Sequence, residues 1–246
     1  MKKYRDLSIL QVDEQKTMVI SCDSCGAVGT KPGDVLQASP ELTGELTARV
    51  ALMEVMCTGA KIQCLYNALS CEMQPTGEQI IKGIRSELKK AGIDPELMSG
   101  STEENFPTCM TAIGIVAIGM SEGNLRVGGV TAGDCAVLIA TPKYGDKIKQ
   151  PVDLDIVSYE EICTILEIKG VKEIVPCGSK GVLYEAKAIA EFNNVRFVAT
   201  NDDSDLLTAS AGPATCAVVA IKHEDLEMLT DKIGQNRMQI LGDYES

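Results

Sequence analysis

Short apolar segments typical of β-strands alternate with helical segments along the whole chain of 246 residues. The strand-type segments are rich in β-branched and apolar side chains, and the helical segments carry apolar side chains every three to four residues. We expect strands at residues 17–23, 61–73, 108–120, 135–141, 172–177, 195–200 and 215–221, and helices at residues 45–59, 75–92, 158–170, 182–193 and 223–234. The alternation predicts a mixed fold of the α+β or α/β class.

A change of character near residues 127–133 predicts a domain boundary. Gly128, Gly129 and Gly133 form a turn-rich joint there, and a new apolar strand follows. We expect an N-terminal domain over residues 1–130 and a C-terminal domain over residues 131–246. Each half is then of a usual domain size.

Composition and charge restrict the classes of partner. The chain is 45% hydrophobic and 24% charged, which is typical of a globular protein and excludes wholesale disorder. Its formal net charge of -12 argues against general binding to nucleic acids or anionic membranes, since such binders present concentrated positive charge. No apolar run approaches the roughly 18 residues that span a bilayer, and the first residues do not resemble a secretory segment. We therefore expect a cytoplasmic protein.

The ten cysteines are expected to be reduced in such a compartment. Eight of them are isolated, mostly within apolar runs, where cysteine behaves as a small buried hydrophobic residue. Cys22 and Cys25 form a lone CxxC, which could be half of a metal site or a redox pair. Structural zinc would need a second pair or a histidine nearby, and the only histidine is His223. Strand alternation places Asp23 on the same face as Cys25, and we favour Asp23 as a metal-facing carboxylate over thiol chemistry.

Three further segments are candidates for chemistry. No P-loop or dinucleotide fingerprint is present, but the sequence Gly178-Ser179-Lys180-Gly181 lies between a strand and a helix. Free amides, a hydroxyl and an ammonium at a helix N-terminus suit an anion, although the same residues also fit a plain turn with an exposed lysine. Residues 100–108 place Glu103, Glu104 and Asn105 in a polar loop, which suits Mg²⁺ or is simply a solvated acidic turn.

Glu54 stands out because it interrupts an otherwise apolar helix. A buried carboxylate is costly unless a cation or a hydrogen-bond donor meets it. Arg49, five residues earlier, does not share the face of Glu54 well enough to be its assured partner. Glu54 is therefore a candidate site residue, with a half-exposed helical glutamate as the alternative.

Taken in order, these segments resemble the aminoimidazole-ribonucleotide-synthetase-like (PurM-like) superfamily, which includes thiamine-monophosphate kinase, selenophosphate synthetase and a hydrogenase-maturation protein. YRDLSIL is similar to its N-terminal Asp-Asp-Ala-Ala segment, with Asp6 in register, and MVISCDSCG is similar to its strand ending in a metal-binding Asp, here Asp23. Residues 49–60 resemble its Asn-Leu-Ser-Asp helix, with Glu54 at the acidic position. Residues 100–108 take the place of its Gly-Gly-Asp-Thr loop, and residues 176–191 that of its Ser-Asp-Gly-Gly-Leu turn and helix.

The departures point to one branch of that superfamily. Lys180 stands where the kinases have an Asp that touches substrate or metal, so the chain is not simply a thiamine-monophosphate kinase. CDSCG together with STEENF and GSKG most resembles the α-ribazole kinases of cobamide salvage, which transfer a phosphoryl group from ATP to a nucleoside 5′-hydroxyl. The alternatives are a related kinase or synthetase with another acceptor, a nucleotide-binding regulatory or scaffold dimer without catalysis, and a thiol-dependent metal or chalcogen carrier using the CxxC.

The resemblance implies a two-domain protein with a shortened second domain. It implies a homodimer whose N-terminal sheets pair in a dimeric β-barrel, with ATP and Mg²⁺ bound near the interface and a nucleoside-like small molecule as substrate. The implied metal ligands are Asp6, Asp23, Glu54 and Glu104 or Asn105. The implied nucleotide or substrate contacts are Asp6, Asp23, Glu54, Gly100, Ser101, Thr102, Gly178, Ser179 and Gly181. Lys180 and Asp23 would be the catalytic residues.

Overall fold

A computed structural model describes residues 1–150, 152–200 and 205–246 of the chain. It divides into two compact units. Unit 1 comprises Met1–Met56 and Ala60–Gly123, and unit 2 comprises Cys57–Gly59 and Asn124–Ser246. No helix in the described ranges combines the length and the apolar composition needed to cross a membrane.

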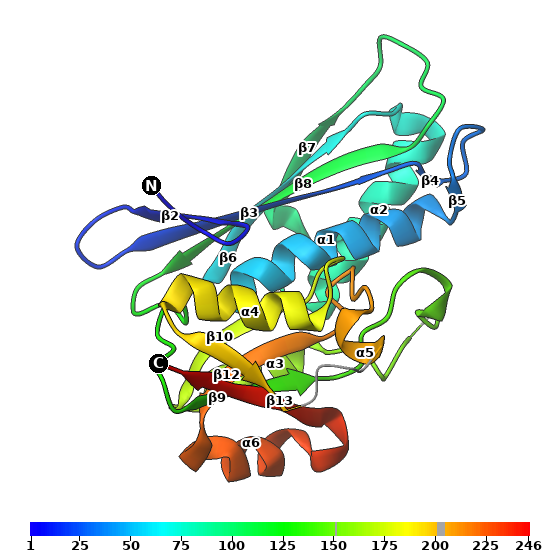
Figure 1. Ribbon diagram of the computed structural model, residues 1–246. Helices are drawn as coiled ribbons and strands as arrows, with labels where there is room; N and C mark the ends of the chain where they lie inside the picture. Colours follow the sequence, from blue (N-terminus) through cyan, green and yellow to red (C-terminus); the bar gives the residue numbers. More distant parts are fainter. Residues whose placement is uncertain (151, 201–204) are drawn as a thin grey trace. The chain divides into compact units, whose positions relative to one another are not determined.

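Unit 1 is built on a six-stranded sheet (Figure 1). Its strands, in spatial order, are β1 (Lys2–Tyr4), β2 (Leu7–Gln11), β3 (Thr17–Gly26), β8 (Ala112–Ser121), β6 (Lys61–Leu69) and β7 (Met98–Thr102). Neighbouring strands are antiparallel except β6 and β7, which are parallel. Two short strands, β4 (Val28–Gly29) and β5 (Leu36–Gln37), form a separate parallel pair.

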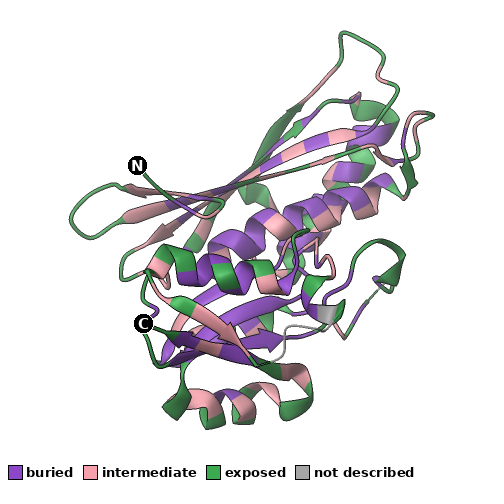
Figure 2. Ribbon diagram, viewed as in Figure 1, coloured by how far each residue is buried: buried purple, intermediate pink, exposed green. Residues whose placement is uncertain are grey.

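Two helices cover one face of this sheet. Helix α1 (Pro40–Met56) packs on β3 and β8, and α2 (Glu78–Lys90) packs on α1. The two helices approach so closely that a Cβ atom on Gly83 would lie 1.8 Å from the carbonyl oxygen of Glu41. A short π-helical turn (Met73–Gly77) precedes α2, and a 3₁₀ turn (Pro95–Leu97) precedes β7. Figure 2 shows α1 mostly buried, whereas the strands alternate between buried and partly exposed residues.

The strands and helices expected in the first half are present, but several bounds differ. Strand β6 ends at Leu69 rather than at residue 73, and β8 begins at Ala112 rather than at residue 108. Helix α1 begins at Pro40 rather than at Glu45. Its first turns were not recognised in the sequence because the helix is buried on several sides and shows no clear amphipathic pattern there. Strands β1, β2, β4, β5 and β7 were not expected from the sequence. Strand β7 lies at an edge with mostly exposed polar residues, so it shows no alternation of apolar and polar side chains.

Unit 2 contains a five-stranded antiparallel sheet. Its spatial order is β10 (Val171–Pro176), β12 (Ala217–Lys222), β9 (Asp134–Ile139), β13 (Met238–Glu245) and β11 (Arg196–Ala199). The helices are α3 (Tyr159–Leu166), α4 (Val182–Asn193), the short α5 (Asp205–Thr208) and α6 (Leu226–Ile233). Three 3₁₀ turns cover Gly145–Lys147, His223–Asp225 and Gln235–Arg237. In Figure 1, α4 and α6 lie on opposite faces of the sheet.

Strand β13 was not expected from the sequence, although it lies between two other strands. A β-bulge between Ile240 and Gly242 interrupts its pairing with β9 and breaks the alternation that would have identified it. The mixed α and β class is confirmed. Over the described residues both sheets are open rather than closed into a barrel, and the dimeric barrel implied by the resemblance requires a second chain.

Candidate functional site

Asp23 lies on the same face of β3 as Cys25, as strand alternation predicted, and helix α1 covers this face. On that face Val19 is fully buried, and the Ser21 hydroxyl donates a hydrogen bond to the carbonyl oxygen of Ala51 in α1 at 2.7 Å. Burial raises the pKa of Asp23, a backbone hydrogen bond at Ser24 partly opposes that rise, and the negative charge of Asp6 adds a smaller increase. Asp6 reaches this position from the turn between β1 and β2. Two predicted site carboxylates therefore lie close enough to repel each other, and a cation bound beside them would relieve that repulsion.

Glu54 is buried in α1, and Arg5 is the cation that meets it. The Arg5 Nη1 atom lies 3.4 Å from Glu54 Oε2, and the two side chains are 5% and 10% exposed. Arg49 pairs with Glu87 of α2 at 3.5 Å. The burial argument for Glu54 is thus confirmed, but its partner was missed, because the partner lies 49 residues away. Arg5 directly precedes Asp6, so this ion pair fastens the turn that carries Asp6 to α1.

The acidic loop after β7 is ordered by its own side chains. Glu104 Oε1 accepts hydrogen bonds from the Met73 amide at 2.8 Å and from the Thr102 hydroxyl at 2.7 Å. Glu103 Oε1 accepts a hydrogen bond from the Asn105 amide at 2.6 Å. Glu104 and Asn105 are both exposed to solvent. The loop therefore presents a fixed carboxylate, as a metal-binding loop requires.

Glycine is required at position 100 because Asn67 lies against it. A Cβ atom at Gly100 would fall 2.4 Å from Asn67 Oδ1, and the Asn67 side chain donates to the Ser99 carbonyl oxygen at 3.1 Å. Gly100 and Ser101 belong to β7 itself rather than to the loop that the sequence predicted.

One row of the sheet connects the two acidic regions. Asp23 pairs with Ile115, Ile115 with Asn67, and Asn67 with Gly100. At about 4.8 Å per strand, Asp23 and Gly100 are roughly 14 Å apart. A single ion binds oxygen ligands at about 2.0–2.6 Å and could not contact both ends of the row. Over the described parts of the chain, no group of three or more His, Cys, Asp or Glu side chains is arranged to hold a metal.

The two cysteines of the CxxC point to opposite faces of β3. Residues three apart in a strand cannot share a face, and Cys22 is exposed while Cys25 faces α1, where it is in hydrogen-bond contact with Thr47. Burial raises the pKa of the Cys25 thiol, which makes it a poor nucleophile at neutral pH. The two thiols therefore cannot bind one metal or form a disulfide with each other while β3 is intact.

The GSKG turn of unit 2 follows β10 and leads into α4. The Gly181 amide donates to the Gly178 carbonyl oxygen at 3.2 Å, so the turn uses an amide that the sequence analysis expected to be free. Gly181 has a φ of 86°, which favours glycine at this position. The Lys180 Nζ atom lies 3.0 Å from the Tyr184 hydroxyl and 4.4 Å from its ring centroid, along the first turn of α4.

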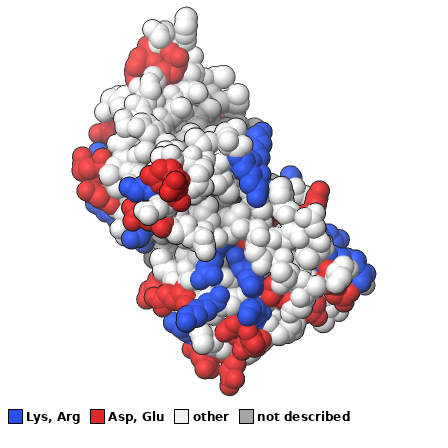
Figure 3. Space-filling view, turned by 90° about the vertical axis from the view of Figure 1, so that its left-hand side faces the viewer, with Lys and Arg blue, Asp and Glu red and all other residues white. Residues whose placement is uncertain are grey.

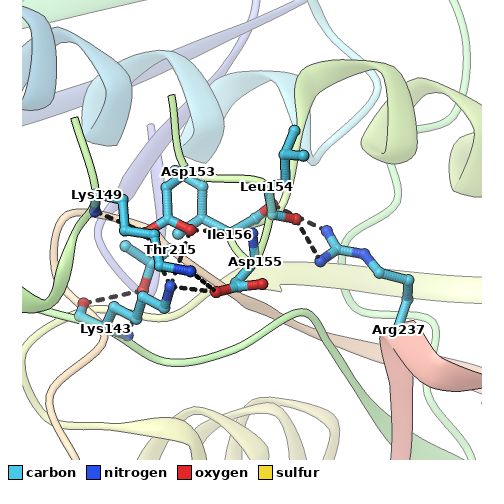
Figure 4. Close-up of polar contacts among 8 residues, drawn as sticks. All are labelled: Lys143, Lys149, Asp153, Leu154, Asp155, Ile156, Thr215 and Arg237. Carbon is cyan, nitrogen blue, oxygen red and sulfur yellow. Dashed lines mark hydrogen bonds and ion pairs between the residues drawn. The ribbon is translucent and has the colours of Figure 1, made fainter. Parts of the chain in front are cut away.

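A series of hydrogen bonds connects this turn to Lys143. The Ala211 amide also donates to the Gly178 carbonyl oxygen, at 3.1 Å, and the Thr215 hydroxyl donates to the Ala211 carbonyl oxygen at 3.0 Å. The same Thr215 hydroxyl accepts the Lys143 amide at 2.9 Å. Figure 4 shows the Lys143 ammonium meeting Asp153 and Asp155, with Arg237 holding the carbonyl groups on either side of Asp155. The GSKG turn is therefore linked by hydrogen bonds to the ion pairs around Lys143.

Charged side chains of both signs are interspersed on the face drawn in Figure 3. Basic groups lie next to acidic ones there and do not merge into one continuous basic surface. An anionic ligand on such a face would be held by local groups rather than by a broad positive field.

Comparison with known proteins gives one family match and a consistent fold. Residues 4–120 match the family described as AIR synthase related protein, N-terminal domain. No curated protein sequence matches the chain.

Among solved structures, E. coli HypE, a hydrogenase maturation protein, is similar with a TM-score of 0.69 at 16% identity, covering 93% of this chain and 79% of that chain. T. maritima PurL complexed with ATP is similar with a TM-score of 0.70 at 14% sequence identity, and the match covers 99% of this chain but only 43% of the PurL chain. AaThiL complexed with AMPPCP and TMP is similar with a TM-score of 0.66 at 12% sequence identity, and the match covers 98% of this chain and 84% of the ThiL chain. The chain thus shares the fold of these proteins, and its residues 4–120 are similar to the AIR synthase related N-terminal domain.

Proposed function

We propose that this protein is an ATP-dependent small-molecule kinase that phosphorylates the 5′-hydroxyl of α-ribazole. The observation that carries the proposal is the pair of neighbouring carboxylates, Asp6 and Asp23, in a domain similar to the AIR synthase related family. Two structural neighbours, PurL and ThiL, were solved with ATP or AMPPCP, which supports nucleotide binding by this fold. The likeness of CDSCG, STEENF and GSKG to α-ribazole kinases supports the acceptor.

The carboxylates of unit 1 would hold Mg²⁺ on the polyphosphate of ATP. The residues fit this ion, because Asp6 and Asp23 are oxygen ligands whose mutual repulsion a cation would relieve. When bound, magnesium neutralises charge on the phosphates and so favours a loose phosphoryl-transfer transition state. Glu54 would act mainly through Arg5, by fixing the turn that carries Asp6. Glu104 or Asn105, at the far end of the same sheet row, would hold a second ion or another part of the ligand.

Gly100, Ser101 and Thr102 would contribute the wall of the nucleotide site beside this acidic loop. In the transfer step the bond between the γ-phosphorus and the bridging oxygen of ATP breaks, and a bond from the acceptor 5′-oxygen to that phosphorus forms. The hydroxyl proton leaves to solvent, and ADP departs. In unit 2, Lys180 would leave the Tyr184 ring to contact the transferred phosphoryl group or the acceptor, with Ser179 and the Gly178 turn beside it.

A direct assay tests this function. The protein is incubated with Mg-ATP and α-ribazole, and in parallel with a panel of other nucleosides, and the products are separated and identified by mass spectrometry. We expect α-ribazole phosphate and ADP in equal amounts, with formation reduced at least a hundredfold in Asp23→Asn and unchanged in the surface control Asp94→Asn. ADP formed without α-ribazole phosphate, but together with another phosphorylated nucleoside, would support a kinase with a different acceptor. No product from any nucleoside would overturn the kinase proposal.

A second candidate function is a nucleotide-binding regulatory dimer without catalysis. The contact between Lys180 and Tyr184 favours it, because a lysine held on an aromatic ring is not directed at a reacting phosphoryl group. The two candidates differ in one result. A regulatory dimer would bind Mg-ATP tightly, and Asp23→Asn would weaken binding without affecting any turnover.

We also propose that the protein is a homodimer formed through unit 1. The face of the sheet opposite α1 carries many apolar side chains that this unit's helices leave partly exposed: Leu10, Met18, Ile20, Cys64, Tyr66, Val116, Ile118 and Met120. A continuous apolar surface of this kind is typical of an interface. Light scattering after gel filtration should give twice the chain mass, and Ile118→Asp should give the monomer. A wild-type monomer at micromolar concentration would overturn this proposal.

A further inference from the structure

Three segments of unit 1 meet beyond one end of the sheet. They are residues 27–38 after β3, residues 70–77 after β6, and residues 103–111 between β7 and β8. The Gly33 amide donates to the Cys109 carbonyl oxygen at 2.8 Å, and the Glu103 amide donates to the Cys71 carbonyl oxygen at 3.1 Å. The first two segments therefore both hold the third, which carries the acidic loop.

Lys31 is the residue that joins all three segments. Its Nζ atom lies 2.6 Å from Glu72 Oε2 and 3.3 Å from the Thr108 carbonyl oxygen. The Lys31 side chain is only 12% exposed, so this is not an ordinary surface ion pair. Its backbone amide donates to Asp34, and Asp34 in turn accepts both the amide and the hydroxyl of Thr111.

Glu72 is held as a carboxylate by this arrangement. Burial opposes its ionisation, but hydrogen bonds from Lys31 and from the Thr76 hydroxyl outweigh that effect and lower its pKa to about 2. Thr76 Oγ1 lies 2.5 Å from Glu72 Oε1, so each carboxylate oxygen has its own donor. Glu72 is therefore fixed in position at neutral pH.

The next residue transmits this order to the acidic loop. The Met73 amide follows Glu72 directly and donates to Glu104 Oε1, which also accepts the Thr102 hydroxyl. Glu104 Oε2 forms no hydrogen bond with any residue that the structure describes. One oxygen of Glu104 is thus committed to the protein, and the other is exposed to solvent and a ligand.

We propose that Lys31 and Glu72 are positioning residues that orient Glu104 toward a divalent cation bound with the nucleotide. This inference rests on the proposed nucleotide-binding function and adds to it the residues that fix the second acidic region. Neither residue touches the ion. They act through the Met73 amide and through the Thr108 carbonyl, which together set the position of the loop at residues 103–111.

The test combines two measurements on the full-length protein. The first is amide hydrogen exchange of the 103–111 segment without nucleotide. Lys31→Met should exchange at least tenfold faster there than the wild type, whereas Lys82→Met should not. Lys82 pairs with Glu41 at 2.8 Å on the exposed surface of the same unit, which makes it a matched control.

The second measurement is the Mg²⁺ concentration that gives half-maximal binding of AMPPCP, well below the melting temperature. We expect it to rise about tenfold in Lys31→Met and in Glu104→Gln, with substantial recovery in Lys31→Arg. If Lys31 acts through Glu104, the double variant should be no worse than the single ones, because effects on one contact do not add. A simple loss of stability would not produce this pattern.

The outcomes separate the two claims. Unchanged Mg²⁺ dependence in Lys31→Met, or full additivity with Glu104→Gln, would overturn the positioning role while leaving nucleotide binding intact. Absence of Mg²⁺-dependent AMPPCP binding by the wild type would overturn the proposed function, and with it this inference.

Discussion

Replacing Lys143 by methionine should destabilise unit 2 strongly. The Lys143 ammonium lies 2.9 Å from both oxygens of Asp153 and 2.7 Å from Asp155 (Figure 4). The Asp153 side chain is 1% exposed, so removal of the cation leaves a buried carboxylate without its counter-charge. Methionine keeps most of the side-chain volume, and the variant therefore tests the charge rather than the packing.

The expected cost is about 3 kcal/mol. Breaking a buried ion pair by removing one partner costs about 3–5 kcal/mol. The lower end applies here, because the backbone amides of Lys149 and Asp155 continue to donate to Asp153 at 2.8 and 3.0 Å. For a unit of this size, 3 kcal/mol corresponds to a decrease of about 10 °C in melting temperature. Lys149→Met removes a side chain that is 68% exposed and pairs with Asp155, so it should cost less than about 1 kcal/mol.

The effect of Lys143→Met should also depend on pH in a defined direction. Hydrogen bonds from Lys143 and Lys149 lower the pKa of Asp155 to about 2. Burial raises the pKa of Asp153, but the hydrogen bonds from Lys143 and from the Lys149 and Asp155 amides, together with the charge of Lys143, lower it overall. Carboxyl groups with lowered pKa values stabilise the fold above their ordinary value of 3.8, and that stabilisation is lost as the pH falls toward 2.

The difference in the free energy of unfolding between the wild type and Lys143→Met, measured by urea unfolding, should therefore be largest near pH 7 and become smaller below about pH 4. A gap of less than 1 kcal/mol at pH 7, or one that widens in acid, would refute the reasoning.

Three further predictions concern unit 1. Gly83→Ala should destabilise the fold by about 1–3 kcal/mol in thermal unfolding, because its Cβ would collide with the Glu41 carbonyl oxygen, whereas Gly123→Ala meets nothing within 4 Å and should be neutral. Arg5→Met should cost about 3 kcal/mol, as it leaves the buried Glu54 carboxylate without this cation, and little loss in urea unfolding would contradict the pairing. Cysteine labelling of the folded, monomeric Ile118→Asp variant, in which the outer face of the sheet is open, should modify Cys22 quickly and Cys25 slowly, and equal rates would show that the two thiols share one environment.

Much of the fold could be predicted because several elements carry their own pattern. Strands β3 and β8 alternate between more buried and less buried residues, and α2 has a strongly amphipathic sequence with a glycine shortly after its end. The elements that were missed lack such patterns. Strand β7 is a polar edge strand, and β13 is interrupted by a bulge before Gly242. Their positions depend on pairing with distant strands, which no local pattern records.

The candidate site likewise contains residues that could be placed from the sequence and residues that could not. Asp23 could be placed from alternation alone, since its strand is regular and its face is set by Val19. The partner of Glu54 could not, because Arg5 reaches α1 only after the β1–β2 turn has folded. The amide of Gly181 was expected to be free, but turn closure uses it within the GSKG segment. The type of a side chain thus indicates which chemistry it could perform, but turn geometry and contacts between distant residues determine which of its groups are available.

The measurement that tests the central claim most directly is calorimetric titration of the protein with AMPPCP, with and without Mg²⁺. We expect binding by the wild type that depends on Mg²⁺, at least tenfold weaker binding in Asp23→Asn, and unchanged binding in Asp94→Asn. Equal affinity in Asp23→Asn and the wild type would contradict a metal-bound nucleotide at this carboxylate pair. Absence of any binding by the wild type would contradict the proposed ATP-dependent function itself.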